Sequence, residues 1–143
     1  MFTIDASVHI NAENPAEAGS TDSQRFLLEI DQRTLMVYSP TLLLVEVAAA
    51  VSRALDDTER GMALAQSIRF LHSWVWIPLD NLLTEEACRV ATEHSLRGAD
   101  AVYAAVALRH GTTLVTLDKL QAKRMLDVLT VKTPAQILQE LSG

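Results

Sequence analysis

The sequence has one cysteine, and it lacks a long uninterrupted hydrophobic run. A single cysteine, Cys88, excludes an intrachain disulfide, and we expect it to be a packed thiol in a reducing compartment. The longest apolar stretch, from Pro40 to Val51, is interrupted by Glu46 and is too short to span a bilayer. No basic and apolar leader precedes the first residues, MFTID, so a cytoplasmic protein is expected.

The chain also lacks an excess of positive charge. Its formal net charge is −6, which argues against a strongly basic nucleic-acid-binding protein. The charge is uneven, because residues 1–96 hold fourteen acidic and six basic side chains, whereas residues 97–143 hold four acidic and six basic ones. Two of those last four acids are Asp100 and Asp118. If both bind a metal, the rest of that segment is distinctly basic.

Several catalytic and nucleotide-binding motifs are missing. The sequence contains no G-x-x-x-x-G-K-[ST] loop, no G-x-G-x-x-G turn and no G-x-S-x-G elbow. Its four histidines are scattered without metal-ligand spacing. These absences argue against a P-loop or dinucleotide site, a serine hydrolase and a zinc centre.

What is present is an alternation of short β-rich runs with helical segments. At 143 residues, 49% hydrophobic and 21% charged, the chain suits one domain over residues 1–143. Strands are predicted at Thr34–Ser39, Trp74–Leu79 and Val128–Thr133, and in two runs that end at Asp5 and Asp118. This alternation predicts an α/β protein with a parallel sheet of about five strands and helices on both faces.

Residue types at the predicted helix starts give the expected boundaries. Residues 11–23 are predicted to be a loop, with Thr21 or Asp22 capping the next helix. Ser39 followed by Pro40 predicts another helix start, and Thr84 a third.

Two of the predicted strands end in an aspartate, at Asp5 and Asp118. In an open α/β sheet, ligands bind beyond the carboxyl ends of the strands. The alternative for each aspartate alone is that it caps the turn that follows. Two aspartates at equivalent strand ends favour a shared site.

Glu46 is placed on an apolar face of its predicted helix. Its neighbours one turn away are Leu42, Leu43, Ala49 and Ala50. A lone carboxylate buried there would cost several kcal/mol or take up a proton, and no Lys or Arg at helical spacing can pair with it. A bound cation would resolve this conflict. The alternative is a side chain that extends to the edge of the sheet and reaches solvent.

Asp100 falls in the first turn of a predicted helix, where it can cap a free N–H and still present an oxygen to the same rim of the sheet.

Four carboxylates from four segments, without His or Cys, suit Mg²⁺ or Mn²⁺ and phosphodiester chemistry. Ser7 and Thr116 are hydroxyls placed to support this site. Basic side chains near two of the acids are candidates for RNA phosphate contacts: Arg97, Lys119, Lys123 and Arg124.

The order of these motifs resembles the PIN domain. The motifs are D-A-S with Asp5 and Ser7, Glu46 in an early apolar helix, R-G-A-D-A with Asp100, and T-L-D with Thr116 and Asp118. At this length the chain looks most like a VapC-type toxin of a toxin–antitoxin pair.

This resemblance implies a three-layer α/β/α sandwich and an endoribonuclease that depends on Mg²⁺ or Mn²⁺. The implied catalytic metal ligands are Asp5, Glu46, Asp100 and Asp118, with Ser7 or Thr116 supporting. The resemblance also implies an RNA substrate, a cognate antitoxin that blocks the site, and a homodimer.

Two other classes of protein remain open from the sequence. A receiver-like signalling module also places aspartates at strand ends and binds Mg²⁺, although the acidic pair that it needs after the first strand is missing. A PIN-fold interaction protein without catalytic activity is the other alternative, and the complete acidic set argues against it.

Overall fold

A computed structural model describes all 143 residues and contains a five-stranded sheet flanked by eight helices. Every strand pairing is parallel, as the sequence predicted. The strands are β1 (Phe2–Ile4), β2 (Val37–Pro40), β3 (Trp74–Ile77), β4 (Thr113–Val115) and β5 (Val131–Lys132). The helices are α1 (Ala6–Ala12), α2 (Ser20–Gln32), α3 (Leu42–Leu55), α4 (Thr58–Arg69), α5 (Asn81–His94), α6 (Gly98–His110), α7 (Lys119–Met125) and α8 (Pro134–Ser142).

The strand order in the sheet is β3-β2-β1-β4-β5. The chain moves outward from β1 to β3 and then returns to the other side of β1 with β4, so the topological switch point lies between β1 and β4. Ligands bind at such switch points in open α/β sheets. Receiver-like modules use the order 2-1-3-4-5, so the strand order overturns that alternative.

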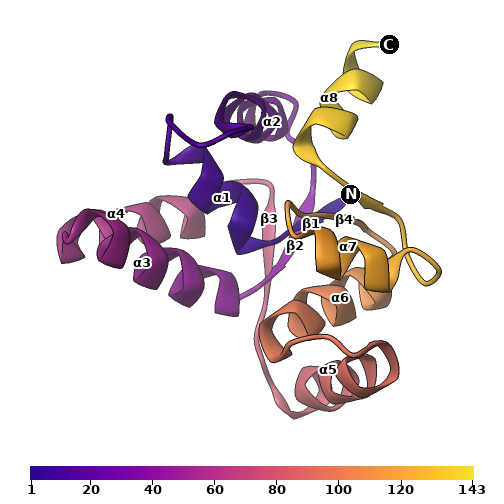
Figure 1. Cartoon of the computed structure of the whole chain (residues 1–143). Helices are drawn as coiled ribbons and strands as arrows, with labels where there is room; N and C mark the ends of the chain where they lie inside the picture. The colour runs from indigo at the N-terminus through magenta and orange to yellow at the C-terminus, as the bar shows by residue number, and fades with distance from the viewer.

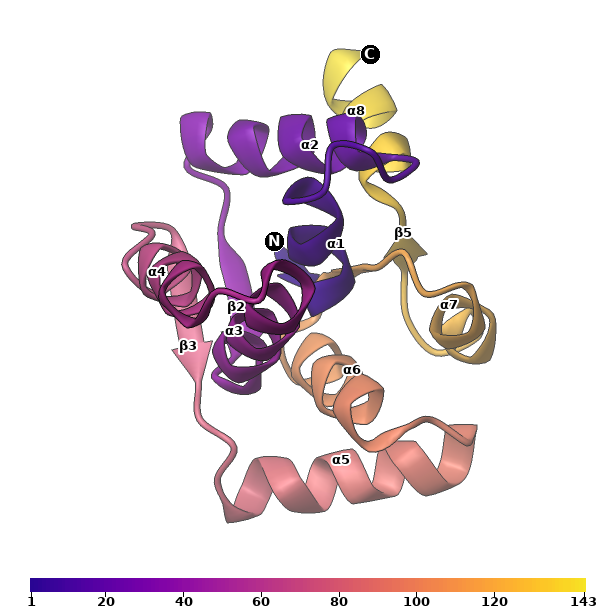
Figure 2. The same cartoon turned by 60° about the vertical axis from the view of Figure 1, so that its left-hand side comes forward.

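Helices cover both faces of the sheet, which confirms the three-layer arrangement. Figures 1 and 2 show α1, α2 and α8 on one side and α5, α6 and α7 on the other. Helix α6 packs directly against β1, β2 and β4, and α5 lies outside it. Residues 101–107 of α6 are all buried, and four of these seven are alanines, which allow the close approach of helix and sheet.

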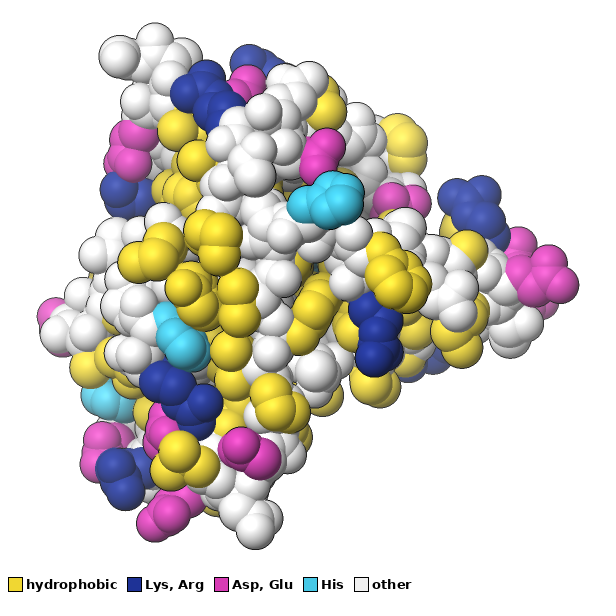
Figure 3. Space-filling view, turned by 180° about the vertical axis from the view of Figure 1, so that it is seen from behind, with side chains coloured by type: hydrophobic (Ala, Val, Ile, Leu, Met, Phe, Trp, Pro, Cys, Tyr) yellow, Lys and Arg dark blue, Asp and Glu magenta, His cyan; other side chains and the backbone are white.

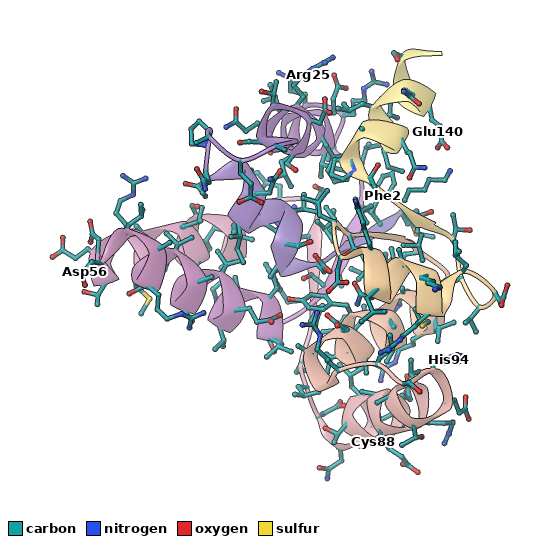
Figure 4. All side chains as sticks on the ribbon, in the orientation of Figure 1. Phe2, Arg25, Asp56, Cys88, His94 and Glu140 are labelled. Atoms are coloured by element: carbon teal, nitrogen blue, oxygen red, sulfur yellow. The ribbon has the colours of Figure 1, made fainter.

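Helices α3 and α4 form a hairpin that extends away from the sheet (Figure 1). Asp56, labelled in Figure 4, lies at its tip. Large hydrophobic side chains are exposed on this hairpin, among them Val45, Met62 and Phe70. The face opposite to the view of Figure 1 also carries a broad group of hydrophobic side chains (Figure 3). These are surfaces on which a partner could pack.

Several predicted boundaries were wrong because a tertiary contact or a backbone conformation outweighed the local residue type. Residues 6–12 form α1, so the predicted loop at 11–23 is shorter than expected. The cap of α2 is Gly19, which has a positive φ of 83°, and neither Thr21 nor Asp22 caps this helix. Pro40 pairs with Ile77 at the end of β2 instead of beginning a helix.

The predicted cap Thr84 was also wrong. Helix α5 begins one turn earlier, where the side chain of Asp80 accepts a hydrogen bond from the Leu83 N–H. Helix α8 begins at Pro134, and Thr133 and Gln136 form a capping box at its start.

Cys88 is exposed on α5, which corrects the expectation of a packed thiol (Figure 4). None of the eight helices has the length and apolar character needed to cross a membrane.

Candidate active site

The site is built around Asp5, which follows β1 at the switch point. Residues 2–4 of β1 pair in register with residues 113–115 of β4, and the Asp5 N–H continues this ladder by donating to the Val115 carbonyl oxygen, 3.1 Å away. This register places the side chains of Asp5 and Thr116 together, although 111 residues separate them. The Asp5 side chain is buried and only 4% of the residue is exposed.

Both predicted supporting hydroxyls contact the Asp5 carboxylate. Oδ1 accepts hydrogen bonds from the Ser7 backbone N–H at 2.9 Å and from the Ser7 hydroxyl. Oδ2 accepts a hydrogen bond from Thr116 Oγ1 at 2.5 Å. Strand β4 ends at Val115, and the Thr116 side chain that follows it faces Asp5.

The two hydroxyls also connect the turn after β1 to the turn after β4. Ser7 Oγ accepts from the Leu117 N–H and Thr116 Oγ1 accepts from the Asp118 N–H, each at 3.0 Å. Because the backbone N–H can only donate, each hydroxyl must direct its own proton to Asp5. The network therefore presents two O–H donors and one N–H donor to a single carboxylate.

Burial and hydrogen bonding act in opposite directions on the pKa of Asp5. Desolvation, the largest effect, and the negative charge of Asp100 raise the pKa, while the hydrogen bonds from Ser7 and Thr116 lower it. The net result is a pKa of about 6. A buried carboxylate with a raised pKa and a nearby second carboxylate is typical of a functional site.

Asp118 caps α7 and does not end a strand as the sequence predicted. Its Oδ1 accepts hydrogen bonds from the N–H groups of Leu120 at 3.0 Å and Gln121 at 3.1 Å. Its Oδ2 is contacted by the guanidinium of Arg97. The cap therefore holds one oxygen of Asp118 and leaves the other directed to the site.

Asp100 lies in the first turn of α6, as predicted, but it caps no N–H group. Its Oδ2 accepts a hydrogen bond from Arg97 Nε at 3.0 Å. Arg97, 70% of whose side chain is exposed, thus bridges Asp100 and Asp118, and these carboxylates raise its pKa, mainly through the hydrogen bond to Asp100. The Gln121 amide donates to the Asp100 carbonyl oxygen at 3.1 Å and ties α7 to the start of α6.

Glu46 reaches the site from α3 and is partly buried. Its side chain has a partner that was not predicted from the sequence: the Tyr103 hydroxyl donates to Glu46 Oε1 at 2.5 Å. Burial and then the charge of Glu46 raise the pKa of Tyr103 above its ordinary value, and the charge of Asp5 adds to this effect. Tyr103 therefore remains a protonated donor. A tyrosine in a run of alanine and valine was the available sequence signal.

The predicted basic residues lie around the same rim on α7 and at the start of α6. Lys119 and Lys123 are exposed on α7. Arg124 donates to the Ser95 carbonyl oxygen, in the loop that leads to α6. Of the four, only Arg97 contacts the acidic side chains.

The donor set fits a hard divalent cation, since it consists of carboxylate and hydroxyl oxygens. The guanidinium of Arg97 acts as an internal cation in the place where two carboxylates approach each other. No group of three or more acidic, histidine or cysteine side chains already surrounds a single point at metal distance. A cation would therefore have to draw the carboxylates together and displace Arg97.

Comparison with known proteins gives both a family and similar structures. A protein-family model described as PIN domain matches residues 2–125. No curated protein sequence matches the chain.

Thirty-six chains of solved structures match the fold. A sarcin-ricin loop cleaving VapC toxin from Mycobacterium tuberculosis is 18% identical, with a TM-score of 0.72, over 86% of this chain and 94% of that one. A toxin–antitoxin complex from Klebsiella pneumoniae is 17% identical, with a TM-score of 0.67, over 94% and 98%. The VapBC complex from Rickettsia felis, bound to a promoter DNA fragment, is 18% identical, with a TM-score of 0.67, over 92% and 97%. At these identities the likeness establishes the fold.

Proposed function

This chain belongs to the PIN domain family, and on that premise we propose that it is a Mg²⁺- or Mn²⁺-dependent endoribonuclease that acts as the toxin of a toxin–antitoxin pair. The observation that carries the proposal is the buried Asp5 carboxylate at the switch point of the sheet. Ser7 and Thr116 donate hydrogen bonds to it, and the negative charge of Asp100 acts on it. Burying a carboxylate lowers the stability of the folded protein, and a purely structural role at this position would not require a buried acid.

Asp5, Glu46, Asp100 and Asp118 would hold the cation. Neighbouring N–H or O–H groups already hold one oxygen of Asp118 and one of Glu46. In Asp5, Ser7 holds Oδ1 and Thr116 holds Oδ2. When bound, the cation supplies charge neutralisation at the phosphodiester and lowers the pKa of a water molecule. The task of this chain's own residues is to restrict the carboxylate side chains through hydrogen bonds, so that less side-chain freedom is lost when they gather around the cation.

Arg97 has two consecutive tasks in this proposal. Without a cation, its guanidinium balances the charges of Asp100 and Asp118. Once a cation replaces it, the exposed side chain is free to bind an RNA phosphate beside the scissile bond. Lys119, Lys123 and Arg124 would add phosphate contacts along α7, which position the RNA without selecting its sequence.

A protein partner is part of the proposal. The similar structure from Klebsiella pneumoniae is described as a toxin–antitoxin complex, and the one from Rickettsia felis as VapBC2 bound to a promoter DNA fragment. The exposed hydrophobic side chains Val45, Met62 and Phe70 of the α3–α4 hairpin are compatible with such a partner or with a second copy of this chain. Both an antitoxin and a homodimer are therefore proposed here.

Cleavage of a labelled mixture of tRNA and ribosomal RNA tests the enzymatic proposal. We expect cleavage with Mn²⁺ or Mg²⁺ and none after chelation with EDTA. Asp5→Asn and Asp100→Asn should each lower the rate by about 100-fold or more, since changing even residues that only support metal ligands costs about 10–100-fold. Asp127→Asn, which changes an exposed acid after α7, is the matched control. Activity that survives both EDTA and the two site variants would overturn the proposal.

A further inference from the structure

Tyr103 is a buried side chain whose one polar atom contacts a candidate metal ligand. It lies on α6, only 2% of it is exposed, and its neighbours on that helix are alanine and valine. Its hydroxyl donates to Glu46 Oε1 at 2.5 Å, across 57 residues of sequence. A phenylalanine would fill the same volume without the cost of burying a hydroxyl, so packing alone does not explain a tyrosine here.

Helix α6 carries both Asp100 and Tyr103, which are three residues apart and therefore lie on the same side of the helix. Asp100 faces Arg97 and Asp118, while Tyr103 faces Glu46. The Tyr103 hydroxyl contacts Glu46, and the negative charges of Glu46 and Asp5 both raise its pKa. One rigid helix thus relates the positions of carboxylates that come from separate elements.

Glu46 needs such a contact more than the other three acids do. Asp5 is held by Ser7 and Thr116, Asp118 caps α7, and Asp100 lies on the first turn of α6. Glu46 has a longer side chain, and Tyr103 is its one hydrogen-bond partner. A hydrogen bond to Oε1 restricts the rotamers of Glu46 and leaves Oε2 available to a cation.

We infer that Tyr103 is a positioning residue, which orients Glu46 for divalent-cation binding by donating a hydrogen bond to one of its carboxylate oxygens. This inference rests on the proposed function, because it concerns the same site. Its effect on any cleavage reaction is exerted through Glu46, so cation affinity reports on it directly.

Titration of the metal-free protein with Mn²⁺, followed by calorimetry and by the electron paramagnetic resonance signal of free Mn²⁺, tests the inference. Tyr103→Phe keeps the buried ring and should weaken Mn²⁺ binding about 10-fold, the lower end of the effect of residues that support metal ligands. Tyr38→Phe is the matched control, because Tyr38 stacks on His110 with ring centroids 4.5 Å apart and makes no hydrogen bond to the four acids. Its Mn²⁺ affinity should equal that of the wild type.

A double-variant cycle separates positioning from a general structural role. If Tyr103 acts through Glu46, adding Tyr103→Phe to a Glu46→Gln variant should cause no further loss of Mn²⁺ affinity. A purely structural tyrosine would lower the melting temperature and leave the Mn²⁺ affinity of the folded protein unchanged, which would overturn the inference. If Tyr103→Phe does not fold, Glu46→Asp replaces it: this shorter acid cannot reach the hydroxyl, and an unchanged affinity would also overturn the inference.

The same titration distinguishes failure of the inference from failure of the proposed function. A wild-type protein that binds no Mn²⁺ would contradict the metal-dependent function itself. A wild-type protein that binds Mn²⁺ as tightly as Tyr103→Phe would leave that function standing and remove only the role of Tyr103.

Discussion

Two buried titratable side chains at the start of the chain have pKa values shifted in opposite directions. Burial raises the pKa of Asp5 to about 6 and lowers the pKa of His9 to about 4. The His9 ring lies against Trp74, with centroids 5.4 Å apart, and its Nε2 has no hydrogen-bond partner. Both residues are disfavoured in their charged forms, but acidification charges His9 and neutralises Asp5.

These shifts predict opposite effects on stability between about pH 4 and pH 6. For His9 the unfolded state binds a proton below 6.5 and the folded state only below about 4, so its contribution to the unfolding free energy is lost as the pH falls through this window. For Asp5 the folded state keeps its proton up to about 6, against 3.8 when unperturbed, so its contribution is lost as the pH rises. The contribution of each residue to the unfolding free energy amounts to roughly 3 kcal/mol, at 1.36 kcal/mol per pKa unit.

Urea denaturation at several pH values in EDTA measures this balance. In the wild type the two contributions should nearly cancel. Asp5→Asn should expose the His9 contribution, with a stability that falls by roughly 3 kcal/mol from pH 6.5 to pH 4. His9→Gln should show the reverse slope, with stability falling as the pH rises. The same pH dependence in all three proteins would contradict both assignments.

At the level of elements, the α3–α4 hairpin carries Glu46 and depends on a close helix crossing. Gly61 of α4 faces α3, where an added Cβ would lie 2.4 Å from the Ala48 carbonyl oxygen and 2.9 Å from Ser52 Cβ. Both distances are shorter than van der Waals contact. Glycine is therefore required by the separation of the two helices and not by its backbone angles.

Gly61→Ala should consequently destabilise the protein by about 1–3 kcal/mol, the usual cost of overpacking. In an exposed helix the same change stabilises by about 1 kcal/mol, so the sign is diagnostic. Gly98→Ala is the matched control, because no atom lies within 4 Å of its added Cβ in the first turn of α6. Its free energy of unfolding should stay the same or rise by up to about 1 kcal/mol. Equal effects of the two substitutions would contradict the close crossing.

At the level of the whole molecule, the site exists only when the sheet and its helices are assembled. Asp5 follows β1, Glu46 lies on α3, Asp100 on α6 and Asp118 before α7. An unfolded chain cannot hold these four carboxylates near one point. Any cation that binds them together therefore binds the folded state alone and stabilises it.

Mn²⁺ at about 100 times its dissociation constant should stabilise the wild type by about 2.7 kcal/mol, which corresponds to roughly 8 °C in melting temperature for a chain of this size. Thermal unfolding with Mn²⁺ and with EDTA measures this increment. Asp118→Asn should lose most of it, whereas the exposed control Asp127→Asn should retain it. The same increment in Asp118→Asn as in the wild type would argue that Mn²⁺ binds elsewhere.

Local residue patterns were enough to predict the class of fold. Alternating β-rich and helical runs predict a parallel sheet because their periodicity is local, and that prediction is confirmed. Boundaries were less well predicted where a backbone conformation or a pairing competes with residue type, as at Gly19 and Pro40. The roles of Asp5, Glu46, Asp100 and Asp118 as metal ligands stay predictions.

The sequence by itself determined that this chain forms an α/β sheet, because the alternation of β-rich and helical runs is a local pattern. It also predicted four carboxylates as candidate metal ligands. Only the tertiary structure decided how these groups meet. The pairing of β1 with β4 brings Thr116 to Asp5, Arg97 bridges Asp100 and Asp118, and Tyr103 reaches Glu46. Such contacts depend on strand order and helix packing, which no local pattern specifies.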